Sequence, residues 1–287
     1  MLKTITSKSY FTCLLLIVFY LFLSTSCSFR RLAIANGDYL VKRKIYTYVS
    51  LKDDQKQKLD GYVDKIWKQV PTYWLAPIVD ELKRLEKTLQ DGLTQEDIQT
   101  SLVNFRKIMK EFWLTHGEGA SELLLSLSSK QLDELASNLE DGNEWIKDKL
   151  EKSEKELKEE WLENELEGFE KFYGAPTKKQ SDLITETLVS VSRVDLEKHL
   201  ASRRSSQESF VAFLKEKPTR KELNERVLRW IERPELLRIG KFQQEYLKRR
   251  ALWIEKLSWR DALANSEQRA YLRHQLTTLI GDLRSAF

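Results

Sequence analysis

The sequence predicts an all-α protein, built as an elongated, antiparallel multi-helix bundle. Of its 287 residues 32% are charged, and only 10 glycines and 5 prolines supply the turns that sheet proteins need in quantity. From about residue 53 onward, apolar residues recur at spacings of three and four, which is typical of amphipathic helices. No stretch shows the strict alternation that predicts a half-buried strand.

The first 26 residues have the layout of a secretory signal peptide. Lys3 and Lys8 precede a run from Phe11 to Leu23 in which Thr12 is the one polar residue. This run is shorter than the roughly 20 apolar residues that cross a bilayer as a helix. We therefore predict that residues 1–26 are removed on export, and an uncleaved anchor is the alternative.

Small residues then lead into a cysteine, in the order Leu23-Ser24-Thr25-Ser26-Cys27. This segment resembles the lipobox of bacterial lipoproteins, in which the cysteine becomes the first residue of the mature chain. The resemblance implies diacylglycerol and an N-acyl chain such as palmitate on Cys27, and we expect no other cofactor. Ser28 replaces the Asp that often retains lipoproteins in the inner membrane, which implies the periplasmic face of the outer membrane. Since Ser24 and Ser26 also suit ordinary signal peptidase, a soluble periplasmic protein is the alternative.

Turn-forming residues divide the rest of the chain into roughly eight to ten helices. The predicted breaks are at Pro71 to Pro77, Asp91-Gly92, His116 to Gly119, Gly174 to Pro176, Lys217-Pro218, Pro234 and Gly240. We predict a lipidated tether over 27–52, a helical bundle over 53–173 and a basic helical bundle over 174–287. The first bundle would include one long charged helix around 129–172, interrupted only at Asp141-Gly142-Asn143.

The long helix and the last bundle carry opposite charge. Residues 133–170 contain 15 acidic and 5 basic side chains, whereas residues 193–287 contain 13 acidic and 21 basic ones. We predict solvated faces with attraction between these two segments. The alternative is that the basic half forms a surface for anionic lipid headgroups or for an acidic partner. Nucleic acid is not an expected partner of an exported protein.

A hydroxyl residue followed three positions later by Gln or an acid recurs at the predicted helix starts. This is the capping box, in which the hydroxyl accepts from a backbone N–H of the first turn and the third residue reaches back. The motif residues are Thr94, Ser128, Gln131, Thr177, Gln180, Thr219 and Glu222, with weaker copies that end at Gln55 and Gln268.

Two families resemble this chain. The Leu-Thr/Ser-x-x-Gln form of the motif resembles the periplasmic Spy and CpxP type proteins, which implies a cradle that binds unfolded clients or a sensor kinase. A closer resemblance is to the uncharacterised DUF6279 family of bacterial lipoproteins, along essentially the whole mature chain. It is carried by Cys27-Ser28, Arg31-Leu32, Asn36, Asp38-Tyr39, Tyr48 to Gln55, Leu127 to Gln131 and Ser266 to Arg269. That family implies no catalytic residues.

The residues that usually carry chemistry are few and scattered. The chain has three histidines, His116, His199 and His274, and none has Glu three positions before it. Neither a phosphate-binding glycine loop nor a zinc-protease helix is present in the sequence. We therefore expect no metal site and no enzymatic activity, with an unrecognised hydrolase as a remote alternative.

Aromatic residues offer the best candidates for binding. Most of the eight tryptophans occupy apolar helix positions, where core packing explains them. Tyr73 and Trp74 follow Pro71 at a helix start, and together with Trp67 they are candidate binding residues.

These observations predict a non-catalytic, membrane-anchored lipoprotein of the bacterial cell envelope that binds a protein partner or client, or an envelope component. A holdase-like periplasmic chaperone is the most concrete form of this prediction. An adaptor in envelope assembly or stress sensing, or a binder of lipid or peptidoglycan, is the alternative. The sequence leaves the oligomeric state open.

Overall fold

A computed structural model describes residues 34–187 and 192–286, which are largely helical and include no strand. The signal peptide and Cys27 lie outside the described residues. In chain order the elements are α3 (Gly37–Tyr46), α4 (Asp53–Gln69), the π-helix η1 (Val70–Trp74), α5 (Leu75–Thr88), α6 (Gln95–Leu125), α7 (Ser129–Asp141), α8 (Glu144–Leu150), α9 (Glu154–Tyr173), α10 (Lys178–Thr187), α11 (Arg193–Lys215), α12 (Arg220–Glu232), the 3₁₀-helix η2 (Pro234–Leu237), α13 (Phe242–Leu263) and α14 (Ser266–Ser285). The all-α prediction is confirmed for this part of the chain.

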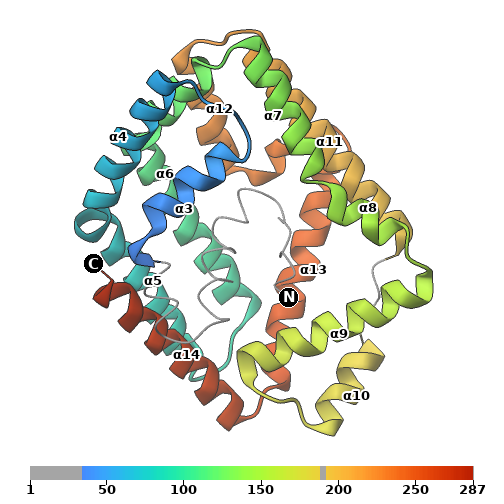
Figure 1. Cartoon of the computed structure of the whole chain (residues 1–287). Coiled ribbons are helices and arrows are strands. Elements are labelled where there is room, and N and C mark those ends of the chain that lie inside the picture. The colour runs from blue at the N-terminus through green and yellow to red at the C-terminus, as the bar shows by residue number, and fades with distance from the viewer. Residues whose placement is uncertain (1–33, 188–191, 287) are drawn as a thin grey trace.

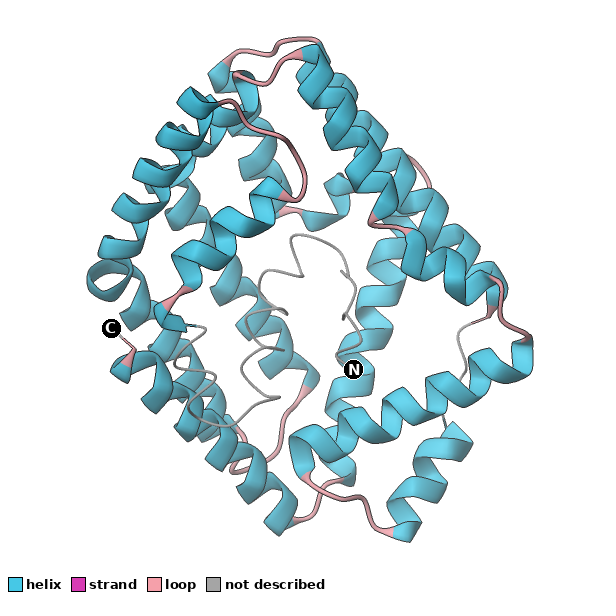
Figure 2. Ribbon diagram, in the orientation of Figure 1, coloured by secondary structure: helices cyan, strands magenta, loops and turns pink. Residues whose placement is uncertain are grey.

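The helices follow one another around a four-sided frame, rather than stacking into a single elongated bundle (Figures 1 and 2). The physical reason is that the buried apolar residues of the described chain fall into separate clusters. The largest cluster joins α5, α9, α10 and α14, and the second joins α7, α11 and α12 with partly buried residues of α6. Both combine elements from either side of residue 174, so the predicted boundary between 173 and 174 does not separate two cores.

The expected long helix around 129–172 is wrong, because α7, α8 and α9 occupy that range. Asn143 is fully buried at the end of α7, where its side chain donates to Glu140 and Gln207 and accepts from Arg203. Ser153 begins α9 with a capping box of its own. The cap at Ser153 favours a new helix start over continuation, so the charged segment turns a corner of the frame (Figure 1).

The predicted break from His116 to Gly119 is also wrong, since α6 runs through it without interruption. The two glycines there permit close packing of aromatic rings. A Cβ atom on Gly117 would lie 2.6 Å from a ring atom of Trp113, and one on Gly119 would lie 2.3 Å from a ring atom of Tyr62. A side chain at either position would overlap a ring, which explains glycine inside a helix.

The second half of the predicted tether is folded. Helix α3 packs on α4, where Lys42 Nζ donates to Asp64 at 2.5 Å and the Tyr46 hydroxyl donates to Asp60 at 3.0 Å. Val49 and Leu51 are then buried in a small cluster with residues of α4. The predicted tether over 27–52 therefore cannot include residues 37–52, which pack against α4.

The predicted attraction between the acidic segment and the basic half is confirmed by ion pairs. Lys256 Nζ lies 2.6 Å from the Glu165 carboxylate, which Arg260 also contacts, and Lys215 Nζ lies 2.6 Å from Asp133. Glu165 is buried, so its pairs act in a medium that screens charge less than water does. Within the described residues, no helix combines the length and apolar character that crossing a membrane requires.

Candidate functional site

The turn that carries Tyr73 and Trp74 is a π-helix rather than a break. Pro71 has no backbone N–H, so it cannot continue the hydrogen-bond ladder of α4. The chain remains coiled by widening one turn, and the N–H of Leu75 donates to the carbonyl of Val70, five residues back. This extra residue changes the phase of the helix, so that Trp74 points into the protein while Tyr73 is 61% exposed.

Trp74 is held by a buried aromatic group from α6. Its Nε1 donates to Nε2 of His116 at 3.0 Å, and its ring meets that of Phe112 edge to face, with centroids 5.3 Å apart. Nε2 of His116 can accept this bond only while it carries no proton. Burial lowers the pKa of His116, and the nearby charge of Lys65 lowers it further, so the neutral form is favoured.

A groove lies between this turn and α6. Its volume is about 650 Å³, and it is lined by Gln69, Tyr73, Trp74, Pro77, Lys107, Ile108, Glu111 and Thr115. The buried Trp74 forms an apolar wall, while the residues from α6 supply both charges and a hydroxyl. This combination can accept an apolar or aromatic side chain and hydrogen-bond the polar groups beside it.

Trp67, the third predicted binding residue, does not line this groove. Its ring instead covers Gly37 at the start of α3, where a Cβ atom would lie 2.1 Å from Trp67 Cη2. Trp67 therefore fixes α3 on α4, whereas Tyr73 and Trp74 share one site.

The capping motif stands at the helix starts. Thr94 accepts from the backbone N–H of Asp97, Ser128 from that of Gln131, and Thr219 from that of Glu222. Thr177 likewise accepts from the N–H of Gln180 at 3.3 Å.

The third residue of the motif distinguishes two kinds of box. Glu222, an acid at this position, is exposed, whereas the glutamines at 55, 131, 180 and 268 are all buried. These glutamines pair: Gln131 Nε2 donates to Gln55 Oε1 at 2.6 Å, and Gln180 Nε2 donates to Gln268 Oε1 at 2.8 Å. The sequence analysis did not predict this pairing. The signal for it was glutamine at the third position of the capping box, because a carboxamide can donate as well as accept a hydrogen bond and an acid cannot.

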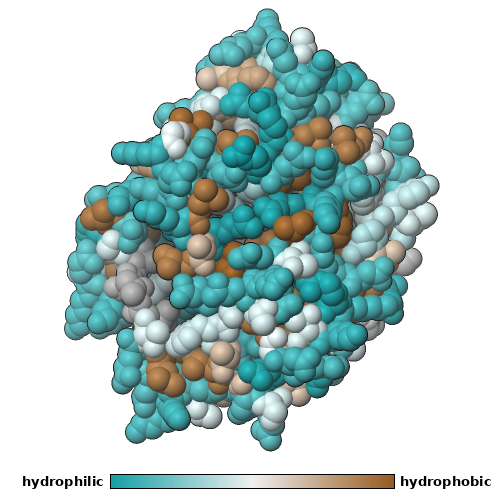
Figure 3. Space-filling view, turned by 180° about the vertical axis from the view of Figure 1, so that it is seen from behind, coloured by the Kyte–Doolittle hydropathy of each residue, from teal (hydrophilic) through white to brown (hydrophobic). Residues whose placement is uncertain are grey.

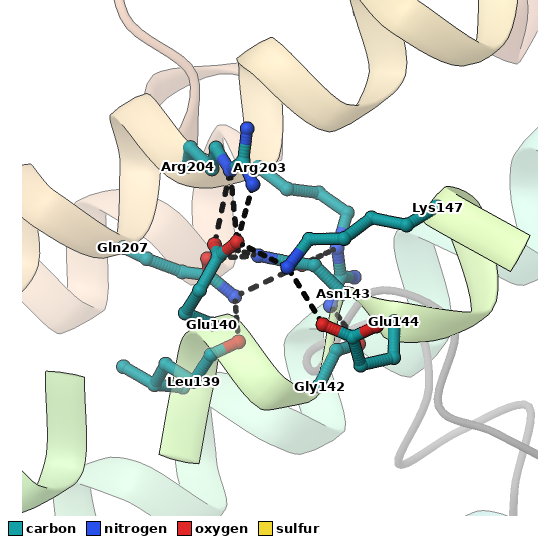
Figure 4. A network of polar contacts seen from close by, with 9 residues as sticks. All are labelled: Leu139, Glu140, Gly142, Asn143, Glu144, Lys147, Arg203, Arg204 and Gln207. Atoms are coloured by element: carbon teal, nitrogen blue, oxygen red, sulfur yellow. Dashed lines mark hydrogen bonds and ion pairs between the residues drawn. The ribbon is translucent and has the colours of Figure 1, made fainter. Parts of the chain in front are cut away.

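A further polar network joins α7 and α8 to α11 (Figure 4). Glu140 accepts from Arg204 and Asn143 and pairs with Lys147, and these hydrogen bonds lower the pKa of its carboxyl to about 2. Gln207 Nε2 donates to the carbonyl of Leu139 at 3.0 Å. Glu140, Asn143 and Lys147 each have two or more partners within the network, which is the arrangement expected of a structural junction.

The described residues bring together no group of three or more His, Cys, Asp or Glu side chains able to hold a metal ion. His199 lies beside Trp145, with ring centroids 6.0 Å apart. His274 is exposed on α14.

Comparison with known proteins identifies no similar protein. No protein-family model matches the chain, and neither a curated protein nor a solved structure shows significant similarity to it. The resemblance to lipoprotein and chaperone families therefore stays a prediction, and the site must be interpreted from its own geometry.

Proposed function

We propose that the protein is a non-catalytic lipoprotein of the bacterial envelope, anchored through Cys27, that binds exposed apolar segments of other proteins. The binding site is the groove beside η1, and a holdase-like role in the periplasm is its concrete form. The observation that carries this proposal is the contrast between two neighbours, because Tyr73 is 61% exposed while Trp74 is held rigidly at the wall of the groove.

A fixed aromatic wall beside a free aromatic side chain suits recognition of a partner's apolar residue. Aromatic residues contribute large contact areas at interfaces, and a rigid wall loses little conformational entropy on binding. On the α6 side, Lys107 can donate to a peptide carbonyl and Glu111 can accept from a peptide N–H. The site would therefore select for an apolar side chain and not for the charge of its neighbours.

The size of the groove favours binding one short segment at a time. On the face seen from behind, apolar side chains form separate patches within a mostly hydrophilic surface (Figure 3). That face therefore differs from the single broad apolar surface that would cover a collapsed client. We infer that any holdase action comes from repeated binding of short segments.

The experiment measures how strongly the mature chain suppresses the aggregation of α-lactalbumin that has been unfolded by reduction. Tyr73→Ser should lower the suppressing activity about tenfold or more, because truncating an aromatic hot-spot residue removes about 2 kcal/mol of binding energy and about 1.4 kcal/mol corresponds to a factor of ten. Tyr271→Ser is the matched control, since Tyr271 is 42% exposed on α14, away from the groove.

Equal activity of the two variants would overturn the groove as the client site. If the wild-type chain suppresses no aggregation but retains one envelope protein through Tyr73, the adaptor function replaces the chaperone function. The anchor is tested separately by intact-mass analysis of the membrane-purified protein beside Cys27→Ala. An unmodified mass in the soluble fraction would contradict the lipoprotein assignment.

A further inference from the structure

A second groove lies between α5 and α14. Its volume is about 490 Å³, and it is lined by Lys83, Glu86, Lys87, Gln90, Ala270, Arg273, His274 and Thr277. In contrast to the groove at Tyr73, its lining contains no aromatic ring except the imidazole of His274. The lining is therefore suited to a charged or strongly polar ligand.

The cations of this groove form no ion pair within the part of the chain that the structure describes. Lys83, Lys87 and Arg273 form no ion pair with any side chain of the described chain, although many of the other basic residues do. The one carboxylate, Glu86, accepts a hydrogen bond from the Thr277 hydroxyl at 2.6 Å. The groove thus presents three positive charges against one negative charge, which favours an anion.

The two helices that line the groove also contribute to the apolar cluster in which the described chain begins. Ile34 is 5% exposed and belongs to this cluster, which joins α5 and α14 with α9 and α10. Cys27 precedes Ile34 by seven residues, which span at most about 25 Å when fully extended. An acyl chain on Cys27 would therefore hold the α5–α14 pair close to the bilayer surface.

We propose that the α5–α14 groove binds the phosphate of an anionic lipid headgroup, with Lys83, Lys87 and Arg273 as its ligands. This inference rests on the proposed anchoring at Cys27 for its choice of lipid over free phosphate. Binding a headgroup there would orient the frame on the membrane, since a single point of attachment fixes position but not orientation. The groove at Tyr73 shares no lining residue with this one, so headgroup binding leaves it available to a partner.

The test uses the full mature chain with Cys27→Ala, so that no acyl chain contributes. Co-sedimentation is measured with vesicles of phosphatidylcholine alone and with vesicles that also contain phosphatidylglycerol. We expect binding to the second kind only, and the triple variant Lys83→Glu, Lys87→Glu, Arg273→Glu should weaken it by more than about tenfold, because each basic residue at an anionic surface adds to binding.

The matched control is Lys130→Glu, Lys217→Glu, Lys221→Glu, which changes the net charge equally. These exposed lysines lie at the starts of α7 and α12 and in the connection before α12, at the opposite corner of the frame from α14 (Figure 1). The control should retain binding within about twofold, since distant charges are screened. Equal loss in both triple variants would overturn the groove as the site.

Two further outcomes separate this inference from the proposed anchoring. If inorganic phosphate raises the melting temperature of the wild-type chain but not of the groove variant, while vesicles are not bound, the ligand is a free anion and the lipid assignment is wrong. If vesicles bind through the groove but intact-mass analysis finds no acyl chain, the groove proposal holds and the anchoring fails.

Discussion

Gln180 and Gln268 form a reciprocal pair in which each carboxamide donates to the other, at 2.8 Å and 3.1 Å. Each glutamine also reaches the connection that precedes its partner's helix, since Gln180 Nε2 donates to the carbonyl of Leu263 and Gln268 Nε2 to that of Ala175. Each side chain therefore accepts from a backbone N–H at the start of its own helix and donates to a carbonyl that precedes its partner's helix. Four backbone groups around the two helix starts find partners in this way.

The same arrangement recurs at the other end of the frame. Gln55 and Gln131 donate to each other, and their Nε2 atoms reach the carbonyls of Ser126 and Ser50. Helices α4 and α7 begin at one end of the frame, and α10 and α14 begin at the opposite end (Figure 1). Two equivalent junctions thus close the frame where the chain reverses direction.

The glutamine pairs should be strongly coupled in stability. Gln180→Ala removes both hydrogen bonds between the two carboxamides and leaves the Leu263 carbonyl without its side-chain donor, so we expect a loss of about 2 kcal/mol in the free energy of unfolding. Gln268→Ala should cost a similar amount, and the double variant should cost less than the sum of the two. Urea unfolding of the four proteins measures this coupling.

Glu222→Ala is the control for that cycle. Glu222 occupies the same capping position in α12 but is exposed and hydrogen-bonds only with Thr219. Its loss should cost at most about 1 kcal/mol. Additive effects of the two glutamine substitutions would show that the pair is no more than two separate caps.

The capping boxes could be predicted from the sequence because each depends on residues three positions apart. Their pairing could not, because Gln55 and Gln131 are 76 positions apart and Gln180 and Gln268 are 88 apart. The burial of Asn143 against Arg203 has the same cause, because these residues are 60 positions apart. The start of α9 is different, since Ser153 and Glu156 form a local capping box that the sequence contains.

The predictions at glycine and proline show a second limit. Gly117 and Gly119 were interpreted as a helix break, although their role is to admit the rings of Trp113 and Tyr62. Around Pro71 the sequence located the exposed aromatic segment but could not say whether Tyr73 or Trp74 points outward. The π-turn shifts the helical phase by one residue, and that shift decides it.

Glu165 should be one of the most sensitive charged residues. It is 5% exposed and neutralises both Lys256 and Arg260 across the contact between α9 and α13. Glu165→Gln leaves two partly buried cations without a counter-charge, so we expect a loss of about 3 kcal/mol in the free energy of unfolding. Glu159→Gln, whose pair with Lys155 is exposed, should change it by less than about 0.5 kcal/mol. Similar values for the two variants in urea unfolding would contradict this.

Gly37→Ala should destabilise the protein, although alanine is the better helix former. The new Cβ would lie 2.1 Å from the ring of Trp67, so α3 must move away from α4. Gly61→Ala is the matched control, because no atom lies within 4 Å of its Cβ, and it should gain about 0.5–1 kcal/mol. Amide hydrogen exchange should show faster exchange in α3 for Gly37→Ala alone. Combining it with Trp67→Leu should restore protection, and unchanged exchange would show that α3 is not held by this contact.

The stability of the protein should decrease as the pH falls below about 6.5, the ordinary pKa of an unfolded histidine. Burial and Lys65 lower the pKa of His116 in the folded state, so the unfolded chain binds a proton at a pH where the folded chain does not. Protonation therefore favours unfolding from that pH down to the folded pKa, below which the loss is complete. His116→Gln can still accept from Trp74 but does not titrate, so its melting temperature should depend less on pH across this window. His274→Gln, a change at an exposed histidine, should keep the wild-type dependence. An unaltered pH dependence in His116→Gln would show that the bond between Trp74 and His116 does not link protonation to folding.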